Sequence, residues 1–428
     1  MQKILYPKKE QWQQLLERPD NGLEDLFDTA KGVLQDVQRN KDAALKKYTR
    51  MFDGVTLEEF AVTKEEIDEA CLSVGSDLKE AILTAKSNIE KFHEAQRVSS
   101  KVIETMPGVQ CWQRSVAIDK VGLYIPGGTA PLFSTVLMLA LPAKIAGCKE
   151  IVICTPAGAD GKINPAILYS ANLVGVSRIF KLGGIQAIGA MAYGTETVPS
   201  VSKIFGPGNR FVTAAKQLVS IKEVAIDMPA GPSEVMVMAD ESAEPSFIAA
   251  DLLSQAEHGA DSQVVLLTNS EALIDEVEKE VAAQLELLPR KDVAEKALGN
   301  SRLIVLKTEA EMLEMCNDYA PEHLIISMRD DEEIGSKVTN AGSVFLGNYS
   351  PESAGDYASG TNHTLPTQGY AKAYSGVSTD SFMKKITYQK ITQAGLTKLG
   401  PSIEIMAEAE QLIAHKNAVT VRLKKIKN

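Results

Sequence analysis

Glutamine and histidine three residues apart could place two metal ligands side by side. Gln255 and His258 lie in the segment SQAEHG, in a predicted helix that Pro245 opens and Gly259 closes. Both side chains would then project from one face of its last turn. A carbonyl oxygen and an imidazole nitrogen so placed could share a divalent ion. The pattern is equally typical of a histidine favoured by the dipole at a helix C-terminus.

Three further residues with ligand or base chemistry lie in the C-terminal part of the sequence. Asp356 and His363 share the polar segment GDYASGTNHTLPT (355–367), which is too short of apolar residues for a core and therefore either caps a helix or lines a site. His415 lies on the last expected helix, where the ordinary interpretation is a half-exposed histidine. Taken alone, each residue allows a functional or a structural interpretation.

A carboxylate and an imidazole adjoin in the segment APEHLIIS. Glu322 and His323 offer two general bases, with ordinary pKa values near 4.3 and 6.5. Neighbouring side chains on a regular strand point to opposite faces, so both serve one site only if the backbone is irregular there. Pro321 favours such an irregularity. The alternative is a strand-entry pair without function.

Three glycine-rich turns each follow an expected strand and precede an expected helix. Such turns bind anions through backbone amides and a helix N-terminus. None is a complete GxGxxG, because Phe211 stands where a third glycine would follow Gly206 and Gly208. They indicate a nucleotide or phosphorylated ligand, or else ordinary tight turns. The turns are IPGGTAP (125–131), KLGGIQAIGA (181–190) and IFGPGNR (204–210).

The elements that must position these residues follow an α/β pattern. Residues 21–98 show helical periodicity, and short β-branched runs then alternate with helical patterns from about 120 to 347. We therefore predict an α/β fold with two Rossmann-like parallel-sheet domains, an N-terminal helical region and a C-terminal helical appendage. The segment MPAGPS marks the boundary between the two sheets. The expected ranges are 1–20 as an extension, 21–120 with 233–377 as the larger α/β domain, 121–232 as a Rossmann-like domain, and 378–428 as the appendage.

Composition narrows the function classes. A chain of 428 residues is long enough for roughly three domains of about 150 residues. A net charge of −11 disfavours binding to nucleic acid or to anionic lipid surfaces. The sequence has no apolar run of the ~20 residues that span a membrane and no export signal, and its five scattered cysteines suit reduced thiols. We expect a cytoplasmic protein that binds neither nucleic acid nor membrane.

Over residues 20 to 420 the sequence resembles the histidinol dehydrogenase family. The resemblance implies an NAD-dependent, zinc-containing homodimer that oxidises L-histidinol to L-histidine in the last step of histidine biosynthesis. The segments that carry it are VGLYIPGGTAPLFSTVLMLALPAKIAGC (121–148), KIFGPGN (203–209), DMPAGPSEV (227–235), SQAEHGADSQ (254–263), APEHL (320–324), SAGDYASGTNHTLPT (353–367) and EAEQLIAHKNAV (408–419).

The resemblance also implies residue roles. Glu322 and His323 match the family's acid/base pair, with His323 expected to take the hydroxyl proton and Glu322 to activate the water. One zinc per subunit would be held by Gln255, His258, Asp356 and His415. NAD would bind to the domain 121–232, and its contacts match Tyr124, Gln186 and Asn209. Substrate contacts match Ser233, Gln255, His258, His323, Asp356, His363, Glu410 and His415.

The C-terminal segment carries two of these residues. Glu410 and His415 are five residues apart, about 140° around a regular helix, so they cannot share a face. Either the expected amphipathic helix at 401–419 ends or bends between them, or two sites are involved. In the family this segment reaches across the dimer, so His415 is expected to complete the partner's metal site.

Two other classes of protein fit parts of the pattern. One is a zinc hydrolase in which a metal-bound water is the nucleophile and NAD is not needed. The other is a non-catalytic nucleotide-binding or assembly protein, which the sequence favours only if the candidate ligands are dispersed in space.

Overall fold

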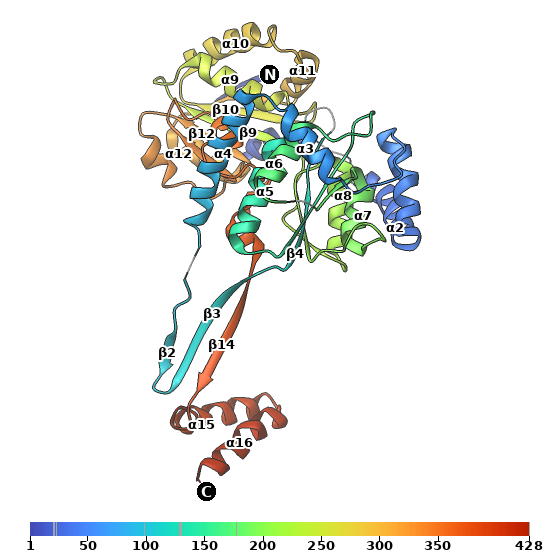
Figure 1. Cartoon of the computed structure of the whole chain (residues 1–428). Coiled ribbons are helices and arrows are strands. Elements are labelled where there is room, and N and C mark those ends of the chain that lie inside the picture. The colour runs from blue at the N-terminus through green and yellow to red at the C-terminus, as the bar shows by residue number, and fades with distance from the viewer. Residues whose placement is uncertain (20–21, 23, 98, 128–130, 177, 428) are drawn as a thin grey trace. The chain divides into compact units, whose positions relative to one another are not determined.

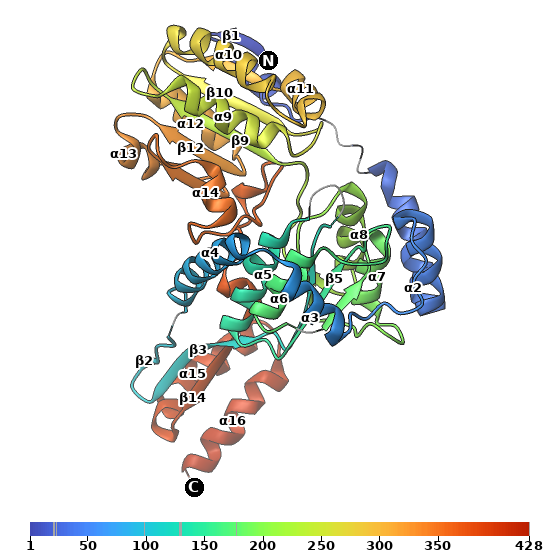
Figure 2. The same ribbon diagram turned by 45° about the horizontal axis from the view of Figure 1, so that its top comes forward.

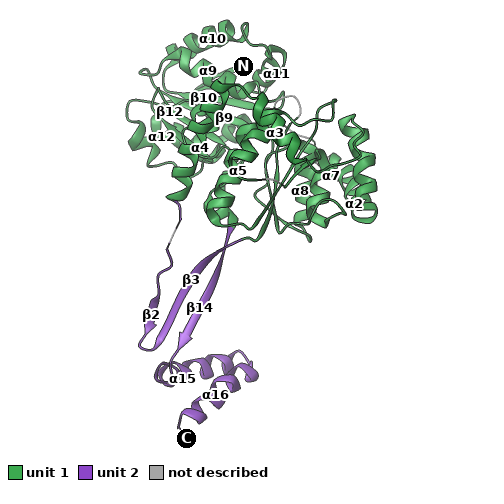
Figure 3. Cartoon of the chain, viewed as in Figure 1, with its two compact units in different colours: residues 1–95, 118–382 green, residues 96–117, 383–428 purple. Residues whose placement is uncertain are grey.

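The computed structural model of the chain describes residues 1–19, 22, 24–97, 99–127, 131–176 and 178–427. The chain forms two compact units, coloured separately in Figure 3. The first comprises Met1–Ala95 with Ile118–Phe382, and the second Gln96–Ala117 with Met383–Asn428. The first contains two parallel sheets, which confirms the predicted fold class.

The six-stranded sheet of the first unit has the order β1-β11-β10-β9-β12-β13, and all its pairings are parallel. The predicted strands between 234 and 347 are all present. The N-terminal residues, which we expected in an extension, add an edge strand to this sheet. Its strands are β1 (Gln2–Leu5), β9 (Glu234–Ala239), β10 (Gln263–Thr268), β11 (Arg302–Val305), β12 (His323–Ser327) and β13 (Ser343–Leu346).

Strand β9 shows why helices cover both faces of this sheet. All six of its residues are buried, as is usual for parallel strands inside an α/β fold. Val235 and Val237 pack against α9, α10 and α11, whereas Met236 and Met238 point to the other face and pack with α1 and α12. Figures 1 and 2 show α9, α10, α11 and α12 around the sheet. The helices that follow the alternation are α1 (Trp12–Leu15), α9 (Pro245–Ala256), α10 (Glu271–Leu285), α11 (Lys291–Gly299), α12 (Glu309–Tyr319), α13 (Asp331–Gly335) and α14 (Glu352–Tyr357).

The five-stranded sheet of the same unit is also parallel, in the order β6-β5-β4-β7-β8. From β4 the chain first builds outward to β5 and β6, and then returns to place β7 on the other side of β4. Ligands of such sheets bind outside the carboxyl ends of the strands, near this reversal. The elements are β4 (Lys120–Tyr124), α5 (Phe133–Ala146), β5 (Glu150–Thr155), α6 (Pro165–Leu173), β6 (Arg178–Lys181), α7 (Gly184–Tyr193), β7 (Lys203–Phe205), α8 (Arg210–Ser220) and β8 (Ala225–Ile226).

The predicted N-terminal helices pack against this five-stranded sheet's helices. They are α2 (Phe27–Tyr48), α3 (Lys64–Ser73) and α4 (Ser76–Glu94), and α2 contacts α7 and α8, α3 contacts α6, and α4 contacts α5. Val33, Leu34 and Val37 share a core with Ile188 and Met191. The expected grouping of 21–120 with 233–377 stays a prediction, since α4 also contacts residues 358 and 362 through Asn88 and His93. Periodicity reveals which face of a helix is apolar but not which partner buries it.

The second unit contains an antiparallel sheet that the sequence analysis missed. We expected helix after about 378, but β14 (Met383–Ile391) is a strand that pairs with β3 (Val109–Ala117), which also pairs with β2 (Ile103–Met106). The expected helix at 401–419 is two helices, α15 (Gln393–Ala409) and α16 (Ile413–Lys427). The break lies at Gln411, whose φ of 60° is left-handed and incompatible with a continuous helix.

None of the described helices is long and apolar enough to cross a membrane. All five cysteines are free thiols.

Candidate active site

Glu322 and His323 lie where the chain enters β12, and the backbone before them is irregular. Ala320 adopts a left-handed conformation with φ 55°, and Glu322 occupies a bend. Glu322 Oε2 consequently lies 3.6 Å from His323 Nδ1, and both side chains are buried. The carboxylate and the imidazole therefore face one another, although they are neighbours in the sequence.

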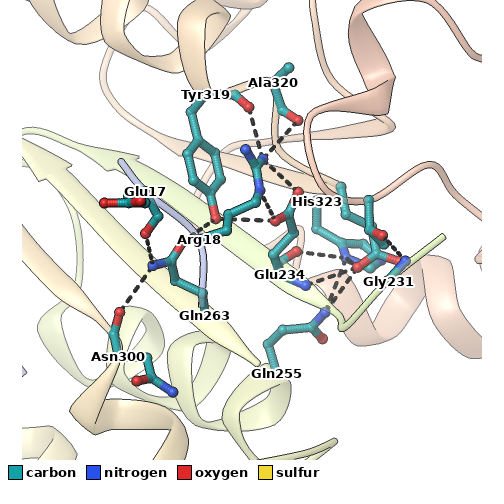
Figure 4. A network of polar contacts seen from close by, with 12 residues as sticks. Glu17, Arg18, Gly231, Glu234, Gln255, Gln263, Asn300, Tyr319, Ala320 and His323 are labelled. Carbon is teal, nitrogen blue, oxygen red and sulfur yellow. Dashed lines mark hydrogen bonds and ion pairs between the residues drawn. The ribbon is translucent and has the colours of Figure 1, made fainter. Parts of the chain in front are cut away.

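The backbone of Glu234, at the start of the neighbouring strand β9, contacts both side chains. Its N–H donates to Glu322 Oε2 at 2.9 Å. Its carbonyl oxygen lies 3.3 Å from His323 Nδ1 (Figure 4). The parallel pairing of β12 with β9 places His323 opposite Val235, one residue further along. One peptide segment thus holds the carboxylate and one imidazole nitrogen.

The Glu234 side chain points away from this pair into a buried polar network (Figure 4). Arg18 binds its carboxylate with two nitrogens, Nε to Oε2 at 2.5 Å and Nη2 to Oε1 at 2.8 Å. The Tyr319 hydroxyl group lies 3.2 Å from Glu234 Oε2 and donates to Gln263 Oε1 at 2.8 Å. The guanidinium also stacks 3.9 Å from the Tyr319 ring. This network anchors the residue whose backbone positions Glu322 and His323.

Asp356 approaches the other imidazole nitrogen of His323. Its Oδ1 lies 3.4 Å from His323 Nε2, within ion-pair distance. The two atoms are not aligned as a hydrogen bond, and neither has another hydrogen-bond partner in the described part of the chain. Helix α14 therefore presents an unsatisfied carboxylate oxygen to an unsatisfied imidazole nitrogen.

Asp356 belongs to a group of three potential metal ligands. Ligand atoms of His258, Glu352 and Asp356 all lie within 4.8 Å of one another. Glu352 and Asp356 are four residues apart on α14, so both project from one face. The buried Glu352 Oε2 also has no hydrogen-bond partner among the described residues. The sequence analysis did not select Glu352; its spacing from Asp356 is the signal that could have found it.

Gln255 is fully buried in the last turn of α9, next to this group. In the amide orientation that satisfies both its polar atoms, its nitrogen donates to Glu352 Oε1 at 2.8 Å and its oxygen accepts from the Glu234 N–H at 3.1 Å. In the opposite orientation, drawn in Figure 4, the nitrogen lies 3.4 Å from Glu322 Oε2. Gln255 thus links α9 to Glu352 and the Glu234 backbone in the first orientation, and to Glu322 and His323 in the second.

His363 lies at the same site and has partners for both ring nitrogens. Its Nδ1 is 2.8 Å from the Asp356 carbonyl oxygen, and its Nε2 is 3.0 Å from the hydroxyl of Thr135 on α5. A neutral ring that donates from Nδ1 and accepts at Nε2 satisfies both contacts. Ser233, which directly precedes β9, is partly exposed. The structure thus brings His363 to the Asp356 backbone.

Burial and mutual charge shift the protonation of these groups. Burial raises the pKa of Glu322 above its ordinary value and also raises that of Glu352, to about 8. Burial alone would lower the pKa of His323, but Glu322 and Asp356 outweigh it and raise the pKa. Loss of hydration lowers the pKa values of His258 and His363. Perturbed, coupled ionisable groups of this kind are typical of active sites.

The predicted NAD contacts lie at the carboxyl ends of the five-stranded sheet. The hydroxyl of Tyr124, the last residue of β4, accepts from the Gly184 N–H at 3.1 Å, and burial raises its pKa to about 12. Gln186 is fully buried on α7, and its Oε1 has no hydrogen-bond partner among the described residues. Asn209 caps α8 by accepting from the N–H groups of Phe211 and Val212, both at 3.1 Å.

The glycine-rich turns occupy the same edge of the sheet. Gly183 and Gly184 open α7, and Gly206 precedes the cap of α8. Gly206 has a φ of 124°, and any side chain there would collide with the Tyr124 carbonyl. Residues 128–130 of the turn IPGGTAP lie outside the described residues. Two of the three turns are therefore placed where α/β sheets bind anions.

Glu410 and His415 lie in the second unit and are both exposed. Glu410 ends α15, and His415 lies in the first turn of α16. The helix thus ends between them, as their five-residue spacing requires if both contact one ligand. These two are the predicted site residues that the first unit does not contain.

Comparison with known proteins shows the family to which the chain belongs. The family model "Histidinol dehydrogenase" matches residues 16–423. The chain is 62% identical over 427 residues to histidinol dehydrogenase of Bacteroides fragilis, with 100% of both chains covered. It is 52% identical over 421 residues to that of Escherichia coli K12, covering 98% of this chain and 96% of the relative. A crystal structure of histidinol dehydrogenase from Elizabethkingia anophelis matches with a TM-score of 0.98 and 56% identity, covering 100% and 99%.

Fold, site and similarity together define an NAD-dependent dehydrogenase. Within that class, the chain belongs to the histidinol dehydrogenase family.

Proposed function

We propose that the protein oxidises L-histidinol to L-histidine in two steps through the aldehyde, in the cytoplasm, as the last step of L-histidine biosynthesis. Conversion of a primary alcohol to a carboxylate removes four electrons and adds one water. Two NAD⁺ molecules, bound in turn, each accept two of these electrons. The reaction needs a base in each step, and the buried pair of Glu322 and His323 is the observation that carries this proposal.

His323 is the base that we assign to the alcohol step. Its Nδ1 faces the Glu234 carbonyl oxygen and Glu322, which leaves Nε2 as the nitrogen without a hydrogen-bond partner among the described residues. We propose that Nε2 of the neutral ring takes the hydroxyl proton of histidinol; the raised pKa of His323 makes this form a stronger base and favours it at higher pH. The Glu234 carbonyl supports this role because it fixes the orientation of the ring.

Glu322 is the base that we assign to the aldehyde step. Its Oε2 is held by the Glu234 N–H, and burial raises its pKa, so the carboxylate is a stronger base than an exposed glutamate. We propose that it removes a proton from the water that adds to the aldehyde. One site can then serve both steps without releasing the reactive intermediate.

The residues around Asp356 fit a zinc ion. His258, Glu352 and Asp356 bring their ligand atoms within 4.8 Å of one another, and Asp356 Oδ1 and Glu352 Oε2 are buried without a hydrogen-bond partner in the described part of the chain. We propose one zinc per subunit, held by Gln255, His258 and Asp356 together with His415 of the partner subunit. When bound, zinc supplies a positive charge that holds the substrate's nitrogen atoms. Ser233, His363 and Glu410 are proposed to contact the substrate with these ligands.

A homodimer would supply the residues that lie in the second unit. Ile405, Met406, Leu412 and Ile413 are at least 45% exposed around the helix break, and Val421 is 59% exposed. Apolar side chains exposed this far favour burial against another protein surface. We propose that the C-terminal segment of one subunit brings Glu410 and His415 to the site of its partner.

Purified, zinc-replete protein given histidinol and NAD⁺ tests the function. We expect absorbance at 340 nm from NADH and formation of histidine. A zinc hydrolase or a non-catalytic nucleotide-binding protein would bind zinc or nucleotide without producing NADH. Absence of NADH from folded, zinc-loaded dimer would therefore contradict the proposal.

A further inference from the structure

The five-stranded sheet lacks an acidic residue where dinucleotide-binding folds usually have one. In such folds an Asp or Glu, about 20 residues after the first glycine turn, accepts a hydrogen bond from the ribose 2′-hydroxyl of NAD. Here the strand that follows the first turn is β5, which ends at Thr155 and is followed by Pro156. Glu150 begins this strand at the opposite, amino edge of the sheet and pairs with Arg178. Asp160, the next acidic residue along the chain, accepts from the backbone N–H of Lys162 in its own loop.

Asp53, from the N-terminal helical region, lies at the place where that acid is missing. It ends the segment η3 (Thr49–Asp53), which continues α2. A Cβ atom added to Gly183 would lie 3.1 Å from Asp53 Oδ1 and 2.8 Å from Pro156 Cβ. Asp53 and the residue that follows β5 therefore flank the same glycine, at the start of α7.

The partners of Asp53 tie it to the proposed NAD contacts. Its Oδ2 accepts from Gln186 Nε2 at 3.1 Å, while the buried Oε1 of Gln186 has no hydrogen-bond partner in the described chain. Within the described residues no Lys, Arg or His forms an ion pair with Asp53, and Lys181 at the end of β6 is paired with Glu66. Burial raises the pKa of Asp53 to about 6. An uncompensated carboxylate in this position is suited to accept from neutral hydroxyl groups rather than to bind an anion.

We propose that Asp53 accepts hydrogen bonds from the adenosine ribose hydroxyls of the dinucleotide and so selects NAD⁺ over NADP⁺, an inference that rests on the proposed role of this sheet as the NAD site. The N-terminus of α7 beside it favours the negative charge of the pyrophosphate. A 2′-phosphate would bring a second negative charge to the carboxylate, with no cation of the described residues paired to Asp53 to offset it. Asp53, which follows α2, thereby takes the role of the acidic residue that lies after the first glycine turn in other dinucleotide-binding folds.

Equilibrium binding and kinetics of the full-length dimer test this role. The Asp53→Asn variant keeps the shape of the side chain and removes its charge. Asp42→Asn is the matched control, because Asp42 also ties α2 to this lobe, through the backbone N–H and hydroxyl of Thr197, and is not at the glycine turns. Titration calorimetry with NAD⁺, NADP⁺ and 2′-deoxyadenosine NAD⁺ gives Kd for each ligand, and kcat/KM is measured with NAD⁺ and NADP⁺.

We expect the wild type to bind NAD⁺ roughly tenfold or more tightly than NADP⁺ or the 2′-deoxy analogue, as for a hydrogen bond to a charged group. Asp53→Asn should weaken NAD⁺ binding by about the same factor and bring all three ligands close together, whereas Asp42→Asn should preserve the wild-type ratios. An unchanged ratio in folded Asp53→Asn protein would overturn the inference. If that variant does not fold, equal binding of NAD⁺ and its 2′-deoxy analogue by the wild type overturns it instead. A wild type that neither binds NAD⁺ nor reduces it with histidinol contradicts the proposed function as well.

Discussion

The partly buried Arg18 forms an ion pair with the buried Glu234, with Arg18 Nε 2.5 Å from Glu234 Oε2, behind the peptide group that contacts Glu322 and His323. Through Glu234, the pair connects Arg18, which the sequence analysis did not select as a site residue, to both proposed bases. The pair explains how Glu322 and His323 are kept in place. Because the Glu234 side chain is anchored, its backbone N–H and carbonyl oxygen provide one contact each for Glu322 and His323.

Replacing Arg18 by Met should therefore damage both stability and catalysis. Loss of one partner from a buried pair typically costs about 3–5 kcal/mol, because the other charge stays buried without compensation. We expect urea unfolding to show a loss of that order and kcat to fall with it. Lys9→Met is the control, since Lys9 pairs with Glu314 on the surface, where such pairs contribute about 0–1 kcal/mol. Similar small losses in both variants would contradict the anchoring role.

Glu352→Gln should weaken zinc binding without removing a proposed ligand. Glu352 can fix the amide of Gln255 through a 2.8 Å hydrogen bond, and its Oε2, which has no hydrogen-bond partner among the described residues, belongs to the same group as His258 and Asp356. Loss of such a supporting partner typically lowers metal affinity roughly 10–100-fold. Zinc content after competition with a chelator measures the effect. Glu241→Gln, which removes an exposed pair with Arg329, should retain wild-type zinc content; equal retention by Glu352→Gln would refute the prediction.

Oxidation of the aldehyde should slow as the pH falls towards neutrality and below. Glu322 acts as a base only when ionised, and burial raises its pKa, so protonation begins at a higher pH than for an exposed glutamate. We expect the acidic limb of the kcat profile with histidinal to have its midpoint well above the ordinary pKa of a glutamate. The midpoint belongs to the coupled pair with His323 rather than to either residue alone. A rate that stays constant down to about pH 5 would exclude a buried, raised-pKa base.

Mixed dimers should test whether the C-terminal segment serves the partner's site. His323→Ala removes a proposed base from the first unit, and His415→Ala removes a proposed ligand from the second. Each homodimer should be inactive. If His415 acts across the dimer, refolding the two variants together creates one site with both residues intact, and we expect partial activity. No recovery in confirmed heterodimers would place His415 in its own subunit's site or outside any site.

Much of the fold and site could be predicted because the signals are local. The buried runs of β9 and β10 and the helices between them follow from apolar periodicity, and the polar segment 355–367 indicated Asp356 and His363. The adjoining residues of APEHL indicated Glu322 and His323. The structure adds the backbone bend that turns both towards one point.

The remaining features depend on contacts between distant segments. Residue 109 pairs with residue 391 in the antiparallel sheet, whose strands are largely exposed and lack a regular apolar alternation. The roles of three ionisable residues depend on partners that are distant in the sequence, so no local pattern indicates them. These residues are Arg18, Asp53 and Glu352. The left-handed backbone conformation of Gln411 divides a segment whose periodicity predicts one continuous helix.

The number of NADH molecules formed per histidine tests the central claim most directly. With histidinol limiting and NAD⁺ in excess, complete conversion should give two NADH and one histidine, because both oxidations occur before the product leaves. A ratio of one with accumulated aldehyde, or histidine formed without NADH, would contradict the account.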